Sequence, residues 1–76
     1  QSRLHSVLLT PGARAVGRTL AELDLIHLGC EVSAIRRRGI KAVEPLPETR
    51  LEAGDVVVVL GAADAVAAAE QRLLHQ

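Results

Sequence analysis

The chain has 76 residues, enough for one domain with a single hydrophobic core and too few for a multidomain enzyme. Nine Lys and Arg residues balance nine Asp and Glu residues, so no whole-domain field favours a nucleic acid or an anionic membrane. The absence of Phe, Trp and Tyr also removes the stacking platforms of single-strand nucleic-acid binders. An apolar fraction of 49% with only three Pro predicts a folded domain.

Other features of the composition bear on cellular context and assembly. The first residue is not Met, so we expect a fragment of a larger protein. Cys30 is the single cysteine, which excludes an internal disulfide and suits a reducing compartment. The longest strictly apolar run, Val56 to Leu60, is much shorter than the ~20 residues of a membrane-spanning helix, so we expect no membrane insertion. A small core without aromatic side chains leads us to expect an oligomer.

The first third of the sequence predicts a strand and a short helix. Residues 4–9 form an apolar run that ends at a Thr-Pro-Gly turn signal, which predicts the strand. Thr19 and Glu22 have the spacing of a capping box, so we expect a helix that begins at Thr19. Gly29 lies where a left-handed residue would close this helix within three turns.

A β-hairpin is expected next. Residues 31–34 alternate between outward and inward positions, and an extended pattern resumes at residues 40–43. Gly39 is expected to supply the positive φ of the connecting turn, with Arg38 keeping a negative φ because it carries a Cβ.

The remainder predicts a loop, a buried strand and a closing helix. Prolines make residues 44–47 a loop or edge segment, and residues 49–51 are an optional extra strand. Residues 56–60 are β-branched and apolar on both faces, as in a central strand covered on two sides. An alanine-rich helix spans Asp64 to Leu73. The fold class is therefore α+β, with order β-α-β-β-(β)-β-α and a small sheet of four to five strands with two helices.

The sequence offers little for catalysis. The reactive candidates are Cys30, three His and isolated Ser or Thr residues, without the partners that a nucleophile or a general base needs. We interpret Cys30 as a packing residue and His27 as a snorkelling or half-buried spacer on an apolar helical stripe. The chain also lacks metal-ligand spacing and a Gly-rich phosphate loop. We therefore expect neither an enzyme nor a resident metal or cofactor.

Three consecutive arginines, Arg36, Arg37 and Arg38, are the one concentration of charge. Strand alternation would place Arg36 and Arg38 on one side and Arg37 on the other. One interpretation is a solvated hairpin tip. The other is a guanidinium cluster that grips phosphates or carboxylates of an anionic effector.

Four short motifs occur in one order along almost the whole chain. They are Val16-Gly17-Arg18-Thr19-Leu20-Ala21-Glu22-Leu23, Ile35-Arg36-Arg37-Arg38-Gly39, Pro45-Leu46-Pro47-Glu48-Thr49 and Leu51-Glu52-Ala53-Gly54-Asp55. This order resembles the TrkA-C domain, also called the RCK C-terminal domain. The sequence departs from that pattern at Arg38, where the family usually has an acidic residue, so the hairpin tip becomes positive.

The resemblance implies a single regulatory domain over residues 1–76. Such domains belong to potassium channels, potassium uptake systems and cation:proton antiporters, and the Ala/Arg-rich style looks most like the C-terminal part of bacterial Kef-type antiporters. The resemblance also implies a homodimer on the cytoplasmic face of the inner membrane, attached to a membrane transport protein. In such a dimer the interface would form a small-molecule pocket from the hairpin and the proline loop, and an ion or a small anionic or nucleotide effector would bind there. The residues implied near that pocket are Ile35, Arg37, Ile40, Pro45 and Pro47.

Two other interpretations stay open from sequence alone. An ACT-like module would sense amino acids between paired domains, with Gly12 or Gly17 at its first loop-helix junction. A purely structural dimerisation domain would bind no ligand, and its arginines would only keep the hairpin soluble.

Overall fold

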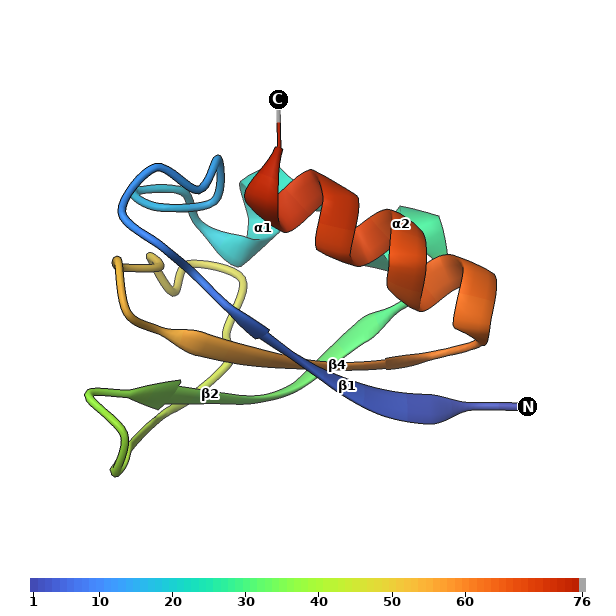
Figure 1. The fold of residues 1–76 in the computed structure, drawn as a ribbon, viewed down its shortest axis with the longest axis horizontal. Coiled ribbons are helices and arrows are strands. Elements are labelled where there is room, and N and C mark those ends of the chain that lie inside the picture. The colour runs from blue at the N-terminus through green and yellow to red at the C-terminus, as the bar shows by residue number, and fades with distance from the viewer. Residues whose placement is uncertain (76) are drawn as a thin grey trace.

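The computed structural model describes residues 1–75, and this part of the chain forms four strands and two α-helices with one 3₁₀ helix between them (Figure 1). In chain order the elements are β1 (Arg3–Leu8), α1 (Leu20–Leu23), the 3₁₀ helix η1 (Leu25–Leu28), β2 (Glu31–Arg37), β3 (Lys41–Val43), β4 (Val56–Gly61) and α2 (Ala63–Leu74). This arrangement confirms the α+β class. The optional fifth strand is reduced to an isolated bridge between Thr19 and Arg50. Neither α-helix in this range has the length and apolar composition that a bilayer crossing requires.

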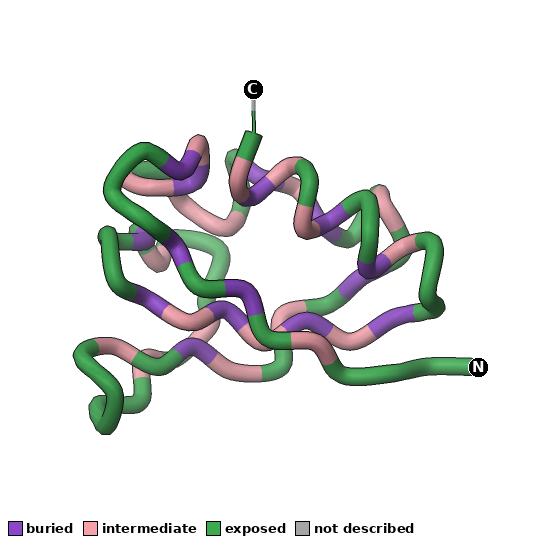
Figure 2. The backbone as a smooth tube through the Cα atoms, viewed as in Figure 1, coloured by how far each residue is buried: buried purple, intermediate pink, exposed green. Residues whose placement is uncertain are grey.

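The sheet has the order β1-β4-β2-β3, and every neighbouring pair is antiparallel. Strand β4 lies in the interior of the sheet, as its apolar sequence predicts, and Val57 and Val59 are completely buried. All helices lie on one side of the sheet (Figure 1). The expectation that β4 is covered on both faces is therefore wrong for the described residues. Its other side chains, including Val56 and Val58, are only half-buried (Figure 2).

The core fills the space between the helices and the inner face of the sheet. Helix α2 contributes Val66, Ala69 and Leu73, which are buried against the strands. Arg72 on the same helix donates from Nη1 to the carbonyl oxygen of Leu23 (3.0 Å). This bond satisfies a carbonyl at the end of α1 and ties the two helices together.

The first helix begins as predicted and is then interrupted. The Thr19 hydroxyl accepts a hydrogen bond from Glu22 N–H, and the Glu22 carboxylate accepts one from Thr19 N–H, which confirms the capping box. Asp24 then adopts a left-handed conformation (φ 53°), so the expected helix becomes α1 and η1, with Gly29 closing η1 at φ 91°. Because this break rotates the residues that follow, the prediction of a half-buried His27 is wrong. Its ring is exposed and contacts the Asp24 carboxylate.

The β2–β3 hairpin exists, but it differs from the expectation in two details. A bulge at Ser33 interrupts the alternation of β2. Arg38 has a positive φ of 54°, and Gly39 has one of 84°, so the prediction of a negative φ at Arg38 is wrong. Two successive residues with positive φ give a tight turn the twist that matches the right-handed twist of the paired strands. Strand pairing therefore outweighs the steric cost of a positive φ at Arg38.

Gly61, at the end of β4, is expected to tolerate no side chain. A Cβ at this position would lie 2.9 Å from Cys30 Sγ and 2.9 Å from the carbonyl oxygen of Gly29. We expect Gly61→Ala to lower the free energy of unfolding by about 1–3 kcal/mol, measured by urea denaturation, because the crowded core must shift. Gly12→Ala is the matched control, since nothing lies within 4 Å of its Cβ position. Equal stability of the two variants would contradict the packing described for Gly61.

Candidate functional site

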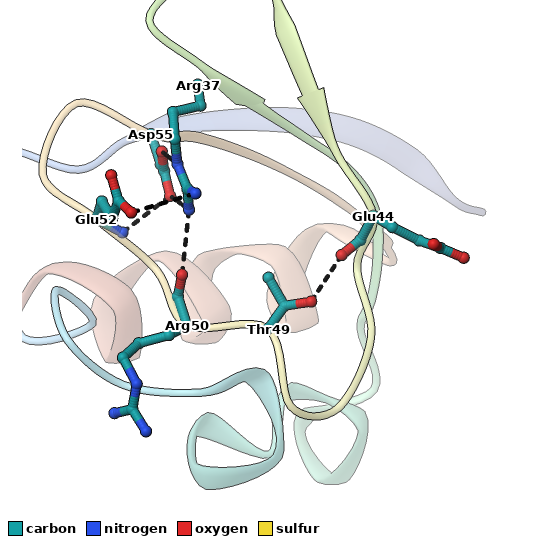
Figure 3. Close-up of polar contacts among 6 residues, drawn as sticks. All are labelled: Arg37, Glu44, Thr49, Arg50, Glu52 and Asp55. Carbon is teal, nitrogen blue, oxygen red and sulfur yellow. Dashed lines mark hydrogen bonds and ion pairs between the residues drawn. The ribbon is translucent and has the colours of Figure 1, made fainter.

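The arginine at the end of β2 is held by an ion pair with the residue that precedes β4 (Figure 3). Arg37 Nε donates to Asp55 Oδ1, and Arg37 Nη2 donates to Asp55 Oδ2, both at 2.9 Å. Nη2 also donates to the carbonyl oxygen of Arg50 (3.1 Å), and Nη1 lies 3.3 Å from Glu52 Oε2. Arg37 therefore clamps the base of the hairpin to the turn that leads into the central strand.

The Arg37–Asp55 pair is enclosed and fully hydrogen-bonded. Asp55 is completely buried, and its Oδ2 accepts a further bond from Glu52 N–H (2.9 Å). Burial by itself would raise the pKa of the Asp55 carboxyl, but the hydrogen bonds from Arg37 and Glu52 and the nearby positive charges hold it below its usual value. The bond to Asp55 in turn raises the pKa of the Arg37 guanidinium. Both groups are charged at neutral pH.

The proline loop, residues 44–49, is closed by Thr49. Its hydroxyl donates to the carbonyl oxygen of Glu44 (2.7 Å), as Figure 3 shows. The same hydroxyl accepts from Leu46 N–H (3.0 Å). The loop is also fixed to the start of α1, because Leu20 N–H donates to Thr49 O and Ala21 N–H donates to Pro47 O. Two of the free amides at the start of that helix are thereby satisfied. The loop is consequently a rigid part of the fold.

Two surface hollows flank Pro45. The first is a groove of about 300 Å³ between α1, η1 and the proline loop, and it is lined by apolar side chains together with Asp24 and Glu31. The second, which we call the hairpin hollow, has a volume of about 370 Å³. It is lined by Ser33, Ala34, Ile35, Arg36, Ala42, Val43, Glu44 and Pro45. Of the two, only the hairpin hollow has a cationic side chain in its wall, so it is the better match for an anionic ligand.

The structure brings some of the predicted site residues together and separates others. Arg36 and Pro45 line the hairpin hollow, and Ile35 forms part of its wall although its side chain is buried in the core. Pro47 lines the groove on the other side of the loop. The remaining three are not in either hollow: Arg37 is occupied by Asp55, while Arg38 and Ile40 are exposed at the hairpin tip.

Sequence reasoning did not identify Asp55 as the partner that makes the three arginines different from one another. In the sequence Asp55 stands out only as the last residue of the motif at residues 51–55. The available signal was an acidic residue directly before a fully apolar strand, because a carboxylate at the edge of a core requires a cationic partner. Cys30, by contrast, is buried as expected, and burial raises the pKa of its thiol, as suits a packing residue.

This small antiparallel sheet, with helices on one face and a proline loop beside its hairpin, is the architecture of the RCK C-terminal domains. The sequence profile of the TrkA-C domain matches residues 4–74, and the chain belongs to this family. It is 32% identical over all 76 residues to the putative K(+) efflux antiporter KefB of Alkalimonas amylolytica, and it spans 12% of that protein's length.

A solved structure shows the same fold. The RCK_C domain dimer of S. agalactiae BusR in complex with c-di-AMP superposes with a TM-score of 0.72. The superposition covers 84% of this chain and 86% of the BusR chain, at 24% sequence identity.

The ion pair predicts a specific pH dependence of stability. Because the folded-state pKa of Asp55 lies below its ordinary value of 3.8, the pair stabilises the fold fully above that pH and is lost as pH falls through the folded-state pKa. We expect Asp55→Asn to lower the free energy of unfolding by about 2–4 kcal/mol at neutral pH and to flatten its fall in acid. Urea denaturation between neutral pH and pH ~3 measures both effects.

Glu52→Gln is the control for this prediction. Glu52 is half-exposed and contacts the same guanidinium, so its loss should cost less than about 1 kcal/mol. The prediction fails if Asp55→Asn is as stable as Glu52→Gln and its free energy of unfolding still falls in acid as it does for the wild-type domain. That result would show that the pair does not stabilise the fold.

Proposed function

We propose that this domain is the regulatory, ligand-sensing and dimerisation module of a potassium or other monovalent cation transport protein, in particular a cation:proton antiporter. Membership of the TrkA-C family supports a regulatory role, and the relative named as a K(+) efflux antiporter supports this context. In this proposal the domain lies on the cytoplasmic face of the inner membrane, attached to the transport protein, and catalyses no reaction.

We further propose that the effector is a small anionic molecule, and that a cyclic dinucleotide is the first candidate. The observation that carries this proposal is the position of Arg36. Among residues 1–75 its guanidinium forms no hydrogen bond or ion pair, and the residue is exposed and lines the hairpin hollow. A guanidinium of this kind suits a phosphate, and the walls of Ala34, Ala42 and Pro45 suit the face of a nucleobase. The BusR domain dimer is a complex with c-di-AMP.

Regulation in this scheme rests on differential binding. A volume of about 370 Å³ is at the small end of ligand sites, so one hollow would hold part of a dinucleotide and a second copy would complete the site. An effector that contacts both copies better in one relative orientation shifts the transport domain toward the state that favours that orientation. An effector with equal affinity for both orientations would have no effect.

Binding of ligands to the isolated domain, measured by thermal shift and calorimetry, tests the proposal. We expect c-di-AMP to raise the melting temperature. Arg36→Ala should weaken binding about 10–100-fold, because it removes a charge-assisted hydrogen bond. Arg18→Ala is the control, since Arg18 is exposed in the loop before α1 and lines neither hollow.

Each contrary result identifies one of the two alternatives. Stabilisation by an amino acid and not by the nucleotide would favour an ACT-like sensor. No stabilisation by a panel of nucleotides, inorganic ions and amino acids would favour a structural dimerisation domain and would overturn the sensing function.

A further inference from the structure

The groove between α1, η1 and the proline loop has no part in the proposed effector site. Its walls are mostly aliphatic, and two of these side chains are exposed, since Ile26 keeps 77% of its accessible surface and Leu46 keeps 38%. A further hollow of about 530 Å³ adjoins the groove, because both are lined by Ile26, Cys30 and Glu31. This hollow extends to Ala62 at the start of α2. We call the groove and this hollow together the trough.

Negative charge is concentrated around the trough, although the whole chain is neutral. Residues 20–32 and 44–49, which form most of its walls, contain five of the nine carboxylates and none of the nine Lys and Arg residues. All nine cationic side chains therefore lie in the other segments, with only four carboxylates beside them. The five carboxylates of the trough segments belong to Glu22, Asp24, Glu31, Glu44 and Glu48.

These carboxylates are not paired with arginines of the same chain. Among residues 1–75 none of the five forms an ion pair with Lys or Arg, and the Asp24 carboxylate contacts the ring of His27. The neighbouring Arg50 and Arg72 donate to backbone carbonyl oxygens instead. Apart from Asp24, which is half-buried, the five residues are exposed. The trough therefore presents an apolar floor with negative charge around it.

We propose that the trough binds a basic amphipathic helix of the transport protein to which, in the proposed function, this domain is attached. Cytoplasmic loops and juxtamembrane segments of membrane proteins carry an excess of Lys and Arg. An amphipathic helix of this kind would place aliphatic side chains against Ile26 and Leu46 and its basic residues near the surrounding carboxylates. The inference rests on the proposed function, and it adds the surface through which the domain contacts the protein that it regulates.

Other occupants fit the trough less well. An anionic membrane or a nucleic acid would be repelled by the five carboxylates. A second copy would offer its hairpin tip, where Arg38, Ile40 and Lys41 are exposed. That contact would join two different surfaces, so each pair would keep one free tip and one free trough unless the copies closed into a ring. A basic helix of the transport protein satisfies the trough without this requirement.

The proline loop connects the trough to the proposed effector site. Pro45 lines both the groove and the hairpin hollow, and the loop is fixed to α1 by bonds from the amides of Leu20 and Ala21. A helix bound in the trough would thus contact an element that also forms a wall of the hollow. If the effector changes the affinity of the trough for the helix, linkage requires the helix to change the affinity for the effector by the same factor.

The first test measures binding of a synthetic peptide to the domain by calorimetry. The probe is a peptide of about 14 residues in which Leu recurs at helical spacing and Lys occupies the other positions. We expect a dissociation constant of ~10–100 μM, because a contact of this small size is weak. The control peptide has Glu in place of each Lys and should not bind detectably.

Variants of the domain locate the contact. Ile26→Lys should weaken binding of the Lys peptide at least tenfold, because it replaces an apolar contact with a like charge. Leu4→Lys is the matched control, since Leu4 is equally aliphatic and exposed (62%) but lies on β1, outside the trough. Asp24→Asn should weaken binding about two- to fivefold, because Asn tolerates the left-handed backbone and only the charge is lost. Circular dichroism confirms that each variant is folded.

Overlapping peptides from the cytoplasmic segments of the transport protein identify the source of the helix. We expect at least one basic amphipathic peptide to bind, and Ile26→Lys to weaken it as it weakens the probe. Equal weakening by Ile26→Lys and Leu4→Lys would show unspecific attraction and overturn the inference. Binding of the probe but of no peptide from the transport protein would overturn the assignment to that protein.

Two further measurements separate this inference from its rivals and from the proposed function. Self-association of the wild-type domain that Ile26→Lys abolishes would make a second copy the occupant of the trough and overturn the inference. Titration of Ile26→Lys with c-di-AMP should give the wild-type affinity, because Ile26 does not line the hairpin hollow. Loss of peptide binding with intact effector binding counts against the trough alone. Intact peptide binding without effector binding counts against the sensing function alone.

Discussion

The hydrogen-bonded ion pair between Arg37 and Asp55 is the contact on which the proposed site depends. It joins the hairpin to the turn before the central strand, two segments 18 residues apart in sequence, at a position where Asp55 is completely buried. A buried carboxylate without its partner would be strongly destabilising, so Arg37 in this position stabilises the fold. The middle arginine of the run is thereby committed to structure. Its neighbour Arg36 lies on the opposite side of β2 and is exposed at the hairpin hollow. Arg37 thus stabilises the fold, while Arg36 is the proposed binding residue.

Local irregularities set the chemistry of the surface around this scaffold. The bulge at Ser33 turns Glu31 and Arg36 to the same face of the sheet, and the left-handed Arg38 and Gly39 complete the hairpin in three residues. The proline loop is held rigidly against α1 by its own carbonyls. The hairpin hollow therefore lies between two fixed elements, at the edge of an apolar face that nothing in the described chain covers. In the proposed function, the hairpin hollow is a preformed part of the effector site and lies beside this uncovered sheet face. A sensor that acts through pairs of domains needs such an arrangement.

Most of the fold could be predicted from the sequence, because it is encoded by strong local signals. The capping box at Thr19, the turn at Gly39 and the valine run of β4 each determine an element with few alternatives. The break at Asp24 and the bulge at Ser33 have no such signal, since both arise from how the chain packs against other elements. The sequence predicts a site between the hairpin and the proline loop, and residues of both segments line the hairpin hollow. The assignment of its ligand-binding residues stays a prediction. Alternation along β2 could not tell that the Arg37 side chain is paired while that of Arg36 has no partner within residues 1–75, because the deciding partner, Asp55, is distant in sequence.

Hydrogen exchange of the Arg37→Met variant, compared with the wild-type domain at one pH, tests the central claim most directly. Methionine keeps the apolar stem but removes the hydrogen bonds to Asp55 and to the Arg50 carbonyl. If the ion pair holds the hairpin and the loop together, amides in residues 44–55 and at the end of β2 should exchange at least tenfold faster, beyond any change in β1 and α2. A uniform change throughout the domain, or unchanged protection in residues 44–55, would contradict the account.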